Sequence, residues 1–156
     1  MTQQDAPLAS VRDATEDDLP RLIELLGYLS MREQREDPSQ LDRYRAAFAA
    51  IAADANQRLL VLDLDGRIIG STVLIIVPNL SNQARPWAQV ENVVVHPDLR
   101  GRGYGEQLMR HALDAARAAG CYKLVLTSNK ERADAHRFYR RLGFQTTHEA
   151  FRYDLS

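Results

Sequence analysis

Residues 100–105, Arg-Gly-Arg-Gly-Tyr-Gly, set two arginines among three glycines directly after an apolar run at residues 90–95. Glycine lets the backbone adopt positive φ angles, so several N–H groups can turn toward one point where a helix begins. The helix dipole adds partial positive charge at that point, and Arg100 and Arg102 add two full charges. The segment therefore predicts a site for a phosphate or pyrophosphate group.

The spacing of this loop excludes two familiar phosphate-binding motifs. The chain contains no GxxxxGK[ST] sequence, and the third glycine comes one residue too early for the dinucleotide pattern GxGxxG. Glycine-rich turns also connect strands to helices without binding a ligand, so the loop alone leaves an ordinary connector as the alternative.

Glu91 is the second residue whose position indicates chemistry. It interrupts an otherwise apolar predicted strand, where an unpaired carboxylate is costly to bury. A carboxylate at such a position can remove a proton from an ammonium group, directly or through water, and so act as a general base. The alternatives are an ion pair with a buried arginine, or substrate binding without proton transfer.

The composition favours one domain spanning residues 1–156, since 45% of the residues are hydrophobic and 26% are charged. A formal net charge of −1 offers no overall attraction to nucleic acid or to an anionic membrane, so neither is expected as a partner. No signal peptide or membrane-spanning segment is recognisable, which predicts a cytoplasmic location. One cysteine and four scattered histidines predict no metal site.

Hydrophobic periodicity predicts an α/β fold in the order β-αα-β-β-β-α-β-α-β(β). The sheet is expected to be mixed, mostly antiparallel and covered by helices on both faces. The Asp65-Gly66 pair predicts a hairpin between two of the strands. The predicted strands are 8–12, 58–64, 67–77, 87–96 and 122–127, with one or two closing strands in 144–155; the predicted helices are one after Thr15, 41–54, one from the glycine loop to Gly120, and 132–142.

Two motifs resemble a known family. Arg100-x-x-Gly103-x-Gly105 is similar to the acyl-CoA pyrophosphate loop, [QR]xxGx[GA], of the GNAT superfamily of N-acetyltransferases, and residues 93–97 resemble the strand before it. Residues 135–144 are similar to the family's AxxxYxxxGF ending. The resemblance covers the chain from about Leu8 to its end. One departure is that Arg132 stands where the family pattern has asparagine, while Asn129 lies three residues earlier.

The resemblance implies an enzyme that transfers the acetyl group of acetyl-CoA to a primary amine of a small molecule. Glu91 is the candidate general base for this amine, and the resemblance implies that the phenol of Tyr139 donates a proton to the departing thiolate, with core packing as the alternative for Tyr139. A backbone N–H near Val94 would polarise the thioester oxygen. The residues implied in cofactor binding are Val93, Val94, Val95, Arg100, Gly101, Arg102, Gly103, Tyr104, Gly105, Glu106, Asn129, Ala135 and Phe138.

The acceptor stays open at this stage because two resemblances within the family conflict. The run 128–132 with the residues after it resembles aminoalkylphosphonate acetyltransferases, whereas Gly-Cys-Tyr-Lys at 120–123 is similar to glucosamine-phosphate acetyltransferases. A protein or peptide acceptor is one alternative, and a non-catalytic acyl-CoA-binding sensor is another. Dimers are common in the family, so a homodimer is compatible with the sequence.

Overall fold

The computed structural model describes residues 7–30 and 33–156. The chain divides into two compact units, the first reaching Val125 and the second running from Leu126 to Ser156. Each unit is described by itself below.

The first unit is built on a five-stranded sheet with the spatial order β1-β2-β3-β4-β5. Strands β1 to β4 are antiparallel neighbours, and β5 runs parallel to β4. The mixed, mostly antiparallel sheet predicted from the sequence is therefore confirmed. The strands are β1 (Ser10–Asp13), β2 (Gln57–Leu64), β3 (Arg67–Val77), β4 (Trp87–Val95) and β5 (Leu124–Val125); the helices are α1 (Leu19–Leu26), α2 (Leu41–Ala53), α3 (Ser81–Ala84) and α4 (Tyr104–Ala118).

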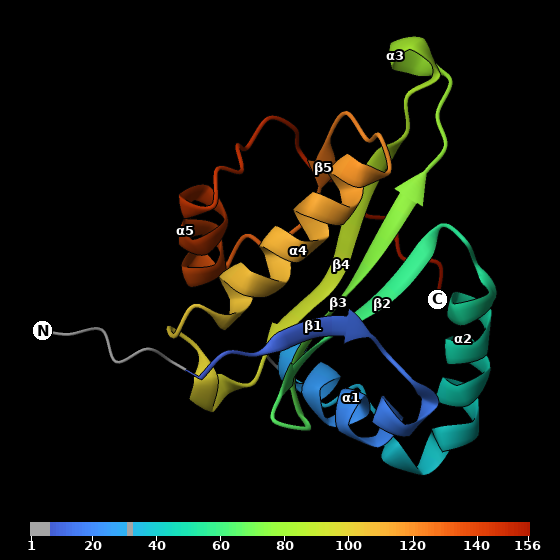
Figure 1. The fold of residues 1–156 in the computed structure, drawn as a ribbon, viewed down its shortest axis with the longest axis vertical. Helices are drawn as coiled ribbons and strands as arrows, with labels where there is room; N and C mark the ends of the chain where they lie inside the picture. The colour runs from blue at the N-terminus through green and yellow to red at the C-terminus, as the bar shows by residue number, and fades with distance from the viewer. Residues whose placement is uncertain (1–6, 31–32) are drawn as a thin grey trace, which may run out of the picture. The chain divides into compact units, whose positions relative to one another are not determined.

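Helices cover both faces of this sheet. Adjacent residues of a strand point to opposite faces, so apolar side chains on each face need a helix to bury them. Val61 of β2 packs with Leu22 and Leu25 of α1, whereas the next residue, Leu62, packs with Tyr104 of α4. Figure 1 shows α4 along one face, with α1 and α2 on the other. We call these the α4 face and the α1 face.

The hairpin between β2 and β3 turns at Asp65-Gly66, as predicted. Both residues have positive φ angles, 51° and 85°, which is the backbone that a tight two-residue hairpin turn requires. Asp63 stabilises the turn by accepting a hydrogen bond from the backbone N–H of Gly66 at 2.7 Å.

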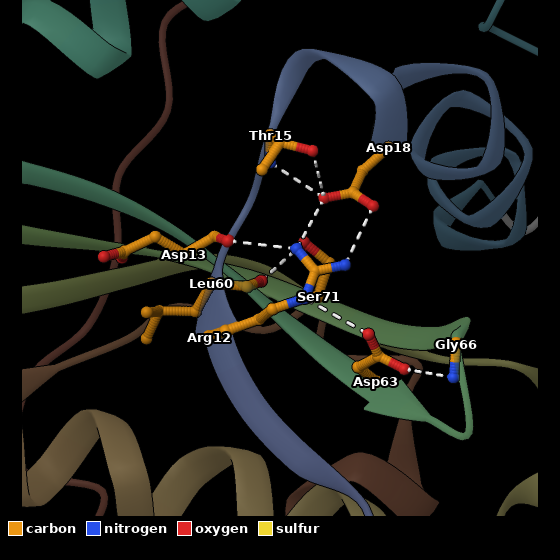
Figure 2. A network of polar contacts seen from close by, with 8 residues as sticks. All are labelled: Arg12, Asp13, Thr15, Asp18, Leu60, Asp63, Gly66 and Ser71. Atoms are coloured by element: carbon orange, nitrogen blue, oxygen red, sulfur yellow. Dashed lines mark hydrogen bonds and ion pairs between the residues drawn. The ribbon is translucent and has the colours of Figure 1, made fainter.

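A polar network joins β1, β2 and the start of the first helical segment (Figure 2). The Arg12 guanidinium donates to Asp18 at 2.8 Å and to Asp63 at 3.1 Å. Asp18 also completes a capping box with Thr15, the N-cap residue predicted from the sequence. The hydrogen bond from Arg12 holds the pKa of the Asp18 carboxyl below its ordinary value, with the Thr15 N–H contributing in the same direction.

Three predicted elements differ from the structure. The strand predicted at 122–127 is ladder-paired only at Leu124–Val125, and the loop at 78–86 contains the short α3, whose residues 82–84 have positive φ angles. The closing strands predicted in 144–155 are wrong, since no strand forms there. Their alternating residues Phe151, Tyr153 and Leu155 are 92%, 87% and 94% exposed, so the pattern exists without a sheet face that buries it.

Replacing Asp18 with asparagine should destabilise the fold by about 1–2 kcal/mol at pH 7, because a capping carboxylate paired with Arg12 is lost. The folded state lowers the pKa of Asp18, so its contribution is complete above the unfolded pKa and disappears as pH falls through the folded one. Urea unfolding of the wild type and of Asp18→Asn between pH 7 and pH 2 measures how their difference in stability changes with pH.

The matched control for this comparison is Asp17→Asn, which changes an exposed acid in the same turn. We expect it to stay within about 0.5 kcal/mol of the wild type at every pH. A stability difference for Asp18→Asn that is unchanged at pH 2 would contradict the assigned role of the carboxylate.

Candidate active site

Strand β4 carries one extra residue in the middle of its pairing with β3. Ser71 pairs with Val94 and Val73 pairs with Glu91, so two residues of β4, Asn92 and Val93, oppose Thr72 alone. Asn92 has a φ angle of 54°, the left-handed conformation found at the first position of such bulges. The central strand is therefore kinked at the position where the sequence places the candidate catalytic groups.

The bulge puts Glu91 on the same sheet face as Val94. Val94 and its partner Ser71 continue the row of Val61, which packs against α1. Glu91 and Val73 continue the row of Leu59, which packs against the same cluster. Residues three apart on a regular strand would face opposite sides, so the extra residue brings the Glu91 carboxylate to the α1 face.

The outer edge of β4 opens immediately before the bulge. β5 pairs with β4 only at Ala88 and Gln89, and in the described part of the first unit no strand pairs with the later residues on that side. The backbone of Val93 and Val95 thus lies on an open strand edge, where an extended amide-containing ligand could pair as a further strand.

Glu91 is half-buried, less enclosed than its place in an apolar run predicts. The side-chain amide of Gln89 donates to Glu91 Oε1, and the hydroxyl of the fully buried Thr72 donates to the Glu91 backbone carbonyl at 2.9 Å. The carboxylate is therefore held by a neutral donor, and no arginine pairs with it among the described contacts. From the sequence, Glu91 could act as general base, pair with a buried arginine or bind substrate without proton transfer. The ion pair with a buried arginine is the role that the structure does not support.

The loop after β4 leads into α4 through two left-handed glycines. Gly101 and Gly103 have φ angles of 75° and 86°, and a Cβ built at either would meet open space. The prediction for the third glycine needs correction: Gly105 has no positive φ because it already lies inside α4. The first ladder bond of the helix is from Gln107 N–H to Gly103 O at 3.1 Å, so the preceding N–H groups lie outside the ladder and can serve an anion.

The side chains of this loop have separate roles. Tyr104 is buried in the α4-face core and donates its hydroxyl to Pro7 O at 3.0 Å, so only its backbone is available to a ligand. Glu106 pairs with Arg110 at 2.7 Å, which offsets its negative charge beside the helix N-terminus. Arg100 donates from Nε to Val95 O at 3.0 Å, and Arg102 is exposed. Positive charge remains at the loop from both arginines.

In the second unit, Tyr139 is fixed by the way α5 (Ala133–Arg141) ends. Gly143, with a φ angle of 102°, donates to Arg140 O at 3.0 Å, and the Phe144 N–H donates to Tyr139 O at 3.0 Å. These two bonds form a Schellman motif, and its characteristic apolar contact is the edge-to-face pair of the Tyr139 and Phe144 rings, with centroids 5.8 Å apart. The Tyr-x-x-x-Gly-Phe pattern is thus a helix end that positions the phenol.

The Tyr139 side chain is 9% exposed. Burial raises the pKa of its phenol above the ordinary value near 10, against the opposing effect of the Arg132 charge. The hydroxyl therefore keeps its proton at neutral pH, as a proton donor must.

The other predicted residues of the second unit are Asn129, which precedes α5, and Ala135 and Phe138, which lie on α5. Asn129 accepts from the Glu131 N–H at 2.9 Å through its side chain, which is a local capping role. Its backbone carbonyl also accepts from Arg132 N–H at 3.0 Å. Ala135 is half-buried on α5, and the Phe138 ring contacts Tyr139 with centroids 5.3 Å apart. Cofactor binding by these three residues stays a prediction.

Sequence reasoning missed Asn92, Thr72 and Gln89. The available signal was Asn92 itself, because asparagine tolerates left-handed backbone and is otherwise unfavourable within a run of valines. Thr72 gave no local signal, since its role arises from strand pairing. Gln89 lies two residues before Glu91 on the same strand, and that spacing was an available signal.

Comparison with known proteins agrees with this geometry. The model of the Acetyltransferase (GNAT) family matches residues 21–144. The chain belongs to this family. It is 32% identical over 145 residues to a glucosamine 6-phosphate N-acetyltransferase of Trypanosoma brucei brucei, covering 93% of this chain and 95% of the relative. The family predicted from the two motifs is confirmed.

Two further comparisons point the same way. An aminoalkylphosphonate N-acetyltransferase of Salmonella typhimurium is 31% identical over 145 residues, covering 93% of this chain and 90% of the relative. A solved structure of a putative acetyltransferase from Agrobacterium tumefaciens superposes with a TM-score of 0.85 at 37% identity, covering 93% of this chain and 99% of that one.

This GNAT protein is an acyltransferase whose acetyl donor is acetyl-CoA, as in the rest of its family. The residues present fit such a donor, because left-handed glycines, free first-turn N–H groups and two arginines converge beside an open strand edge. Within the described residues, no helix has the length and apolarity needed to cross a membrane.

Replacing Asn92 with valine should destabilise the protein by about 1–3 kcal/mol, because a β-branched residue is strained at a positive φ angle. Asn92→Gly accepts the same backbone and should remain within about 1 kcal/mol of the wild type. Urea unfolding of the two variants provides the comparison. Equal stability of the valine and glycine variants would show that β4 is not bulged at this residue.

Proposed function

We propose that this protein transfers the acetyl group of acetyl-CoA to a primary amine of a small molecule by direct attack, within a single acyl-CoA N-acyltransferase domain. The observation that carries the proposal is the bulge of β4, which presents Glu91 on the α1 face beside an open strand edge that leads into an anion-binding loop. Bound acetyl-CoA supplies an activated acetyl group as a thioester.

The loop and the strand edge have distinct binding roles in this proposal. The pyrophosphate lies on the backbone N–H groups of residues 101–106, with Arg100 and Arg102 supplying charge. The backbone of Val93 and Val95 pairs with the amide-rich arm of the donor. A backbone N–H at the bulge, near Val94, polarises the thioester oxygen, a contribution of about a hundredfold or more in similar sites.

Two side chains move protons. Glu91 removes a proton from the acceptor ammonium, directly or through water, so that the nitrogen lone pair becomes available for attack on the carbonyl carbon. Tyr139 gives its phenol proton to the sulfur that leaves when the carbon–sulfur bond breaks. A phenol has an ordinary pKa near 10, so Tyr139 carries the proton that this step needs at neutral pH.

The acceptor class is inferred from the relatives. Two of them are named for glucosamine 6-phosphate and for aminoalkylphosphonates, names that combine an amine with a phosphate or phosphonate. Small amines of these two kinds are therefore the first acceptors to test.

An acceptor panel tests the proposed function. The purified protein is incubated with acetyl-CoA and amino-sugar phosphates, aminoalkylphosphonates, polyamines, amino acids or peptides, and release of free thiol is followed. Turnover with a small amine supports the proposal, and turnover with peptides alone would replace it by peptide acetylation. Acetyl-CoA binding without turnover on any acceptor would overturn it in favour of a non-catalytic sensor.

Replacing Tyr139 with phenylalanine should lower kcat by about a hundredfold or more, because general acid catalysis typically contributes 10²–10⁴-fold. The affinity for acetyl-CoA should change little, since the ring and its contact with Phe144 are kept. Steady-state kinetics and acetyl-CoA titration separate the two quantities. Tyr153→Phe, which changes an exposed tyrosine of the same unit, is the control. Unchanged kcat in Tyr139→Phe would remove the acid role.

A further inference from the structure

A second polar side chain shares the α1 face with Glu91. Gln89 lies two residues earlier on β4, before the bulge, so the two side chains point to the same side of the sheet. The Gln89 Nε2 donates to Glu91 Oε1. An ionised carboxylate only accepts hydrogen bonds, so the amide must present its nitrogen here.

The surroundings of this pair give Gln89 a specific role. In the sheet register, the residues aligned with Glu91 are Val73 on β3 and Leu59 on β2, both apolar. Gln89 is therefore the polar neighbour that the sheet itself supplies to the carboxylate.

The backbone of Gln89 is held by strand pairing on more sides than the backbone of Glu91. It pairs with Ile75 on one side and with Val125 on the other, and it is the last residue of β4 with a strand partner on both edges. Glu91 is held on one edge only, with its carbonyl bound by Thr72. Because the backbone of Gln89 is paired on both edges, its amide starts from a fixed position and can hold the carboxylate of Glu91 at the open edge.

We propose that Gln89 is a positioning residue for Glu91 in acetyl transfer. This inference rests on the proposed role of Glu91 as general base. The amide holds Oε1 and fixes the orientation of the carboxylate, which leaves Oε2 to accept the proton from the acceptor ammonium.

The experiment compares Gln89→Leu, Gln89→Glu, Glu91→Gln and the double variant Gln89→Leu with Glu91→Gln, using an acceptor turned over by the wild type. We expect Gln89→Leu to lower kcat/KM for the acceptor by about tenfold or more, because a hydrogen bond to a charged group is lost. The isosteric Gln89→Glu places a second carboxylate beside Glu91, so the acidic limb of its pH profile should move to higher pH. In the Glu91→Gln background, Gln89→Leu should have no further effect.

Gln57→Leu is the matched control. Gln57 is half-buried in the same row of the sheet as Gln89, and its amide donates to Asp54 at 3.0 Å instead of to Glu91. We expect Gln57→Leu to keep the wild-type kcat/KM and pH profile, and thermal unfolding of each variant checks its fold.

Two results would overturn the inference. One is a pH profile for Gln89→Glu that matches the wild type, and the other is an equal loss of activity from Gln89→Leu with and without Glu91. Wild-type activity in Glu91→Gln would instead remove the proposed base itself. The failure of the positioning role and the failure of the proposed function are thus distinguishable.

Discussion

The interrupted hydrogen-bond ladder between β3 and β4 is the constraint on which the rest of the site depends. One extra residue, in left-handed backbone at Asn92, changes which side of the sheet the following side chains face. The fully buried Thr72 opposes the bulge and binds the Glu91 carbonyl, which stabilises the irregularity from the core. The loss of regular pairing is thus compensated locally, and the bulge brings the Glu91 carboxylate to the α1 face beside the edge that β5 leaves unpaired.

The loop at residues 100–103 is positioned by burial of its neighbour Tyr104. Tyr104 inserts into the α4-face core directly after Gly103, so the start of the helix is fixed by its side chain while its backbone N–H groups stay free. Arg100 is tied back to the carbonyl of Val95, which links the loop to the end of β4. Apolar packing of the Tyr104 side chain therefore fixes the backbone whose first-turn N–H groups lie outside the helix ladder.

Features with a local cause were predictable from the sequence, and features set by pairing were not. The hairpin at Asp65-Gly66 and the left-handed Gly101 and Gly103 follow from residue type. The bulge depends on the register with β3, and its local signal is a single residue, Asn92, that tolerates left-handed backbone. The closing strands failed for the related reason that alternation in residues 151–155 needs a sheet face to bury it. The family was predictable because its two motifs, the glycine loop and the Tyr-x-x-x-Gly-Phe helix end, are both local features of the backbone.

The end of α5 has a consequence for how sequences of this kind can vary. The Schellman motif places Tyr139 four residues before Gly143, so the position of the phenol depends on the C-terminal end of the helix. Insertions or deletions before Arg132 would leave that position unchanged. The displaced asparagine at position 129 lies in this upstream stretch, so a change of length there would not alter the place of Tyr139 on the helix. The residues after Tyr139, and not those before the helix, therefore set where the phenol lies on α5.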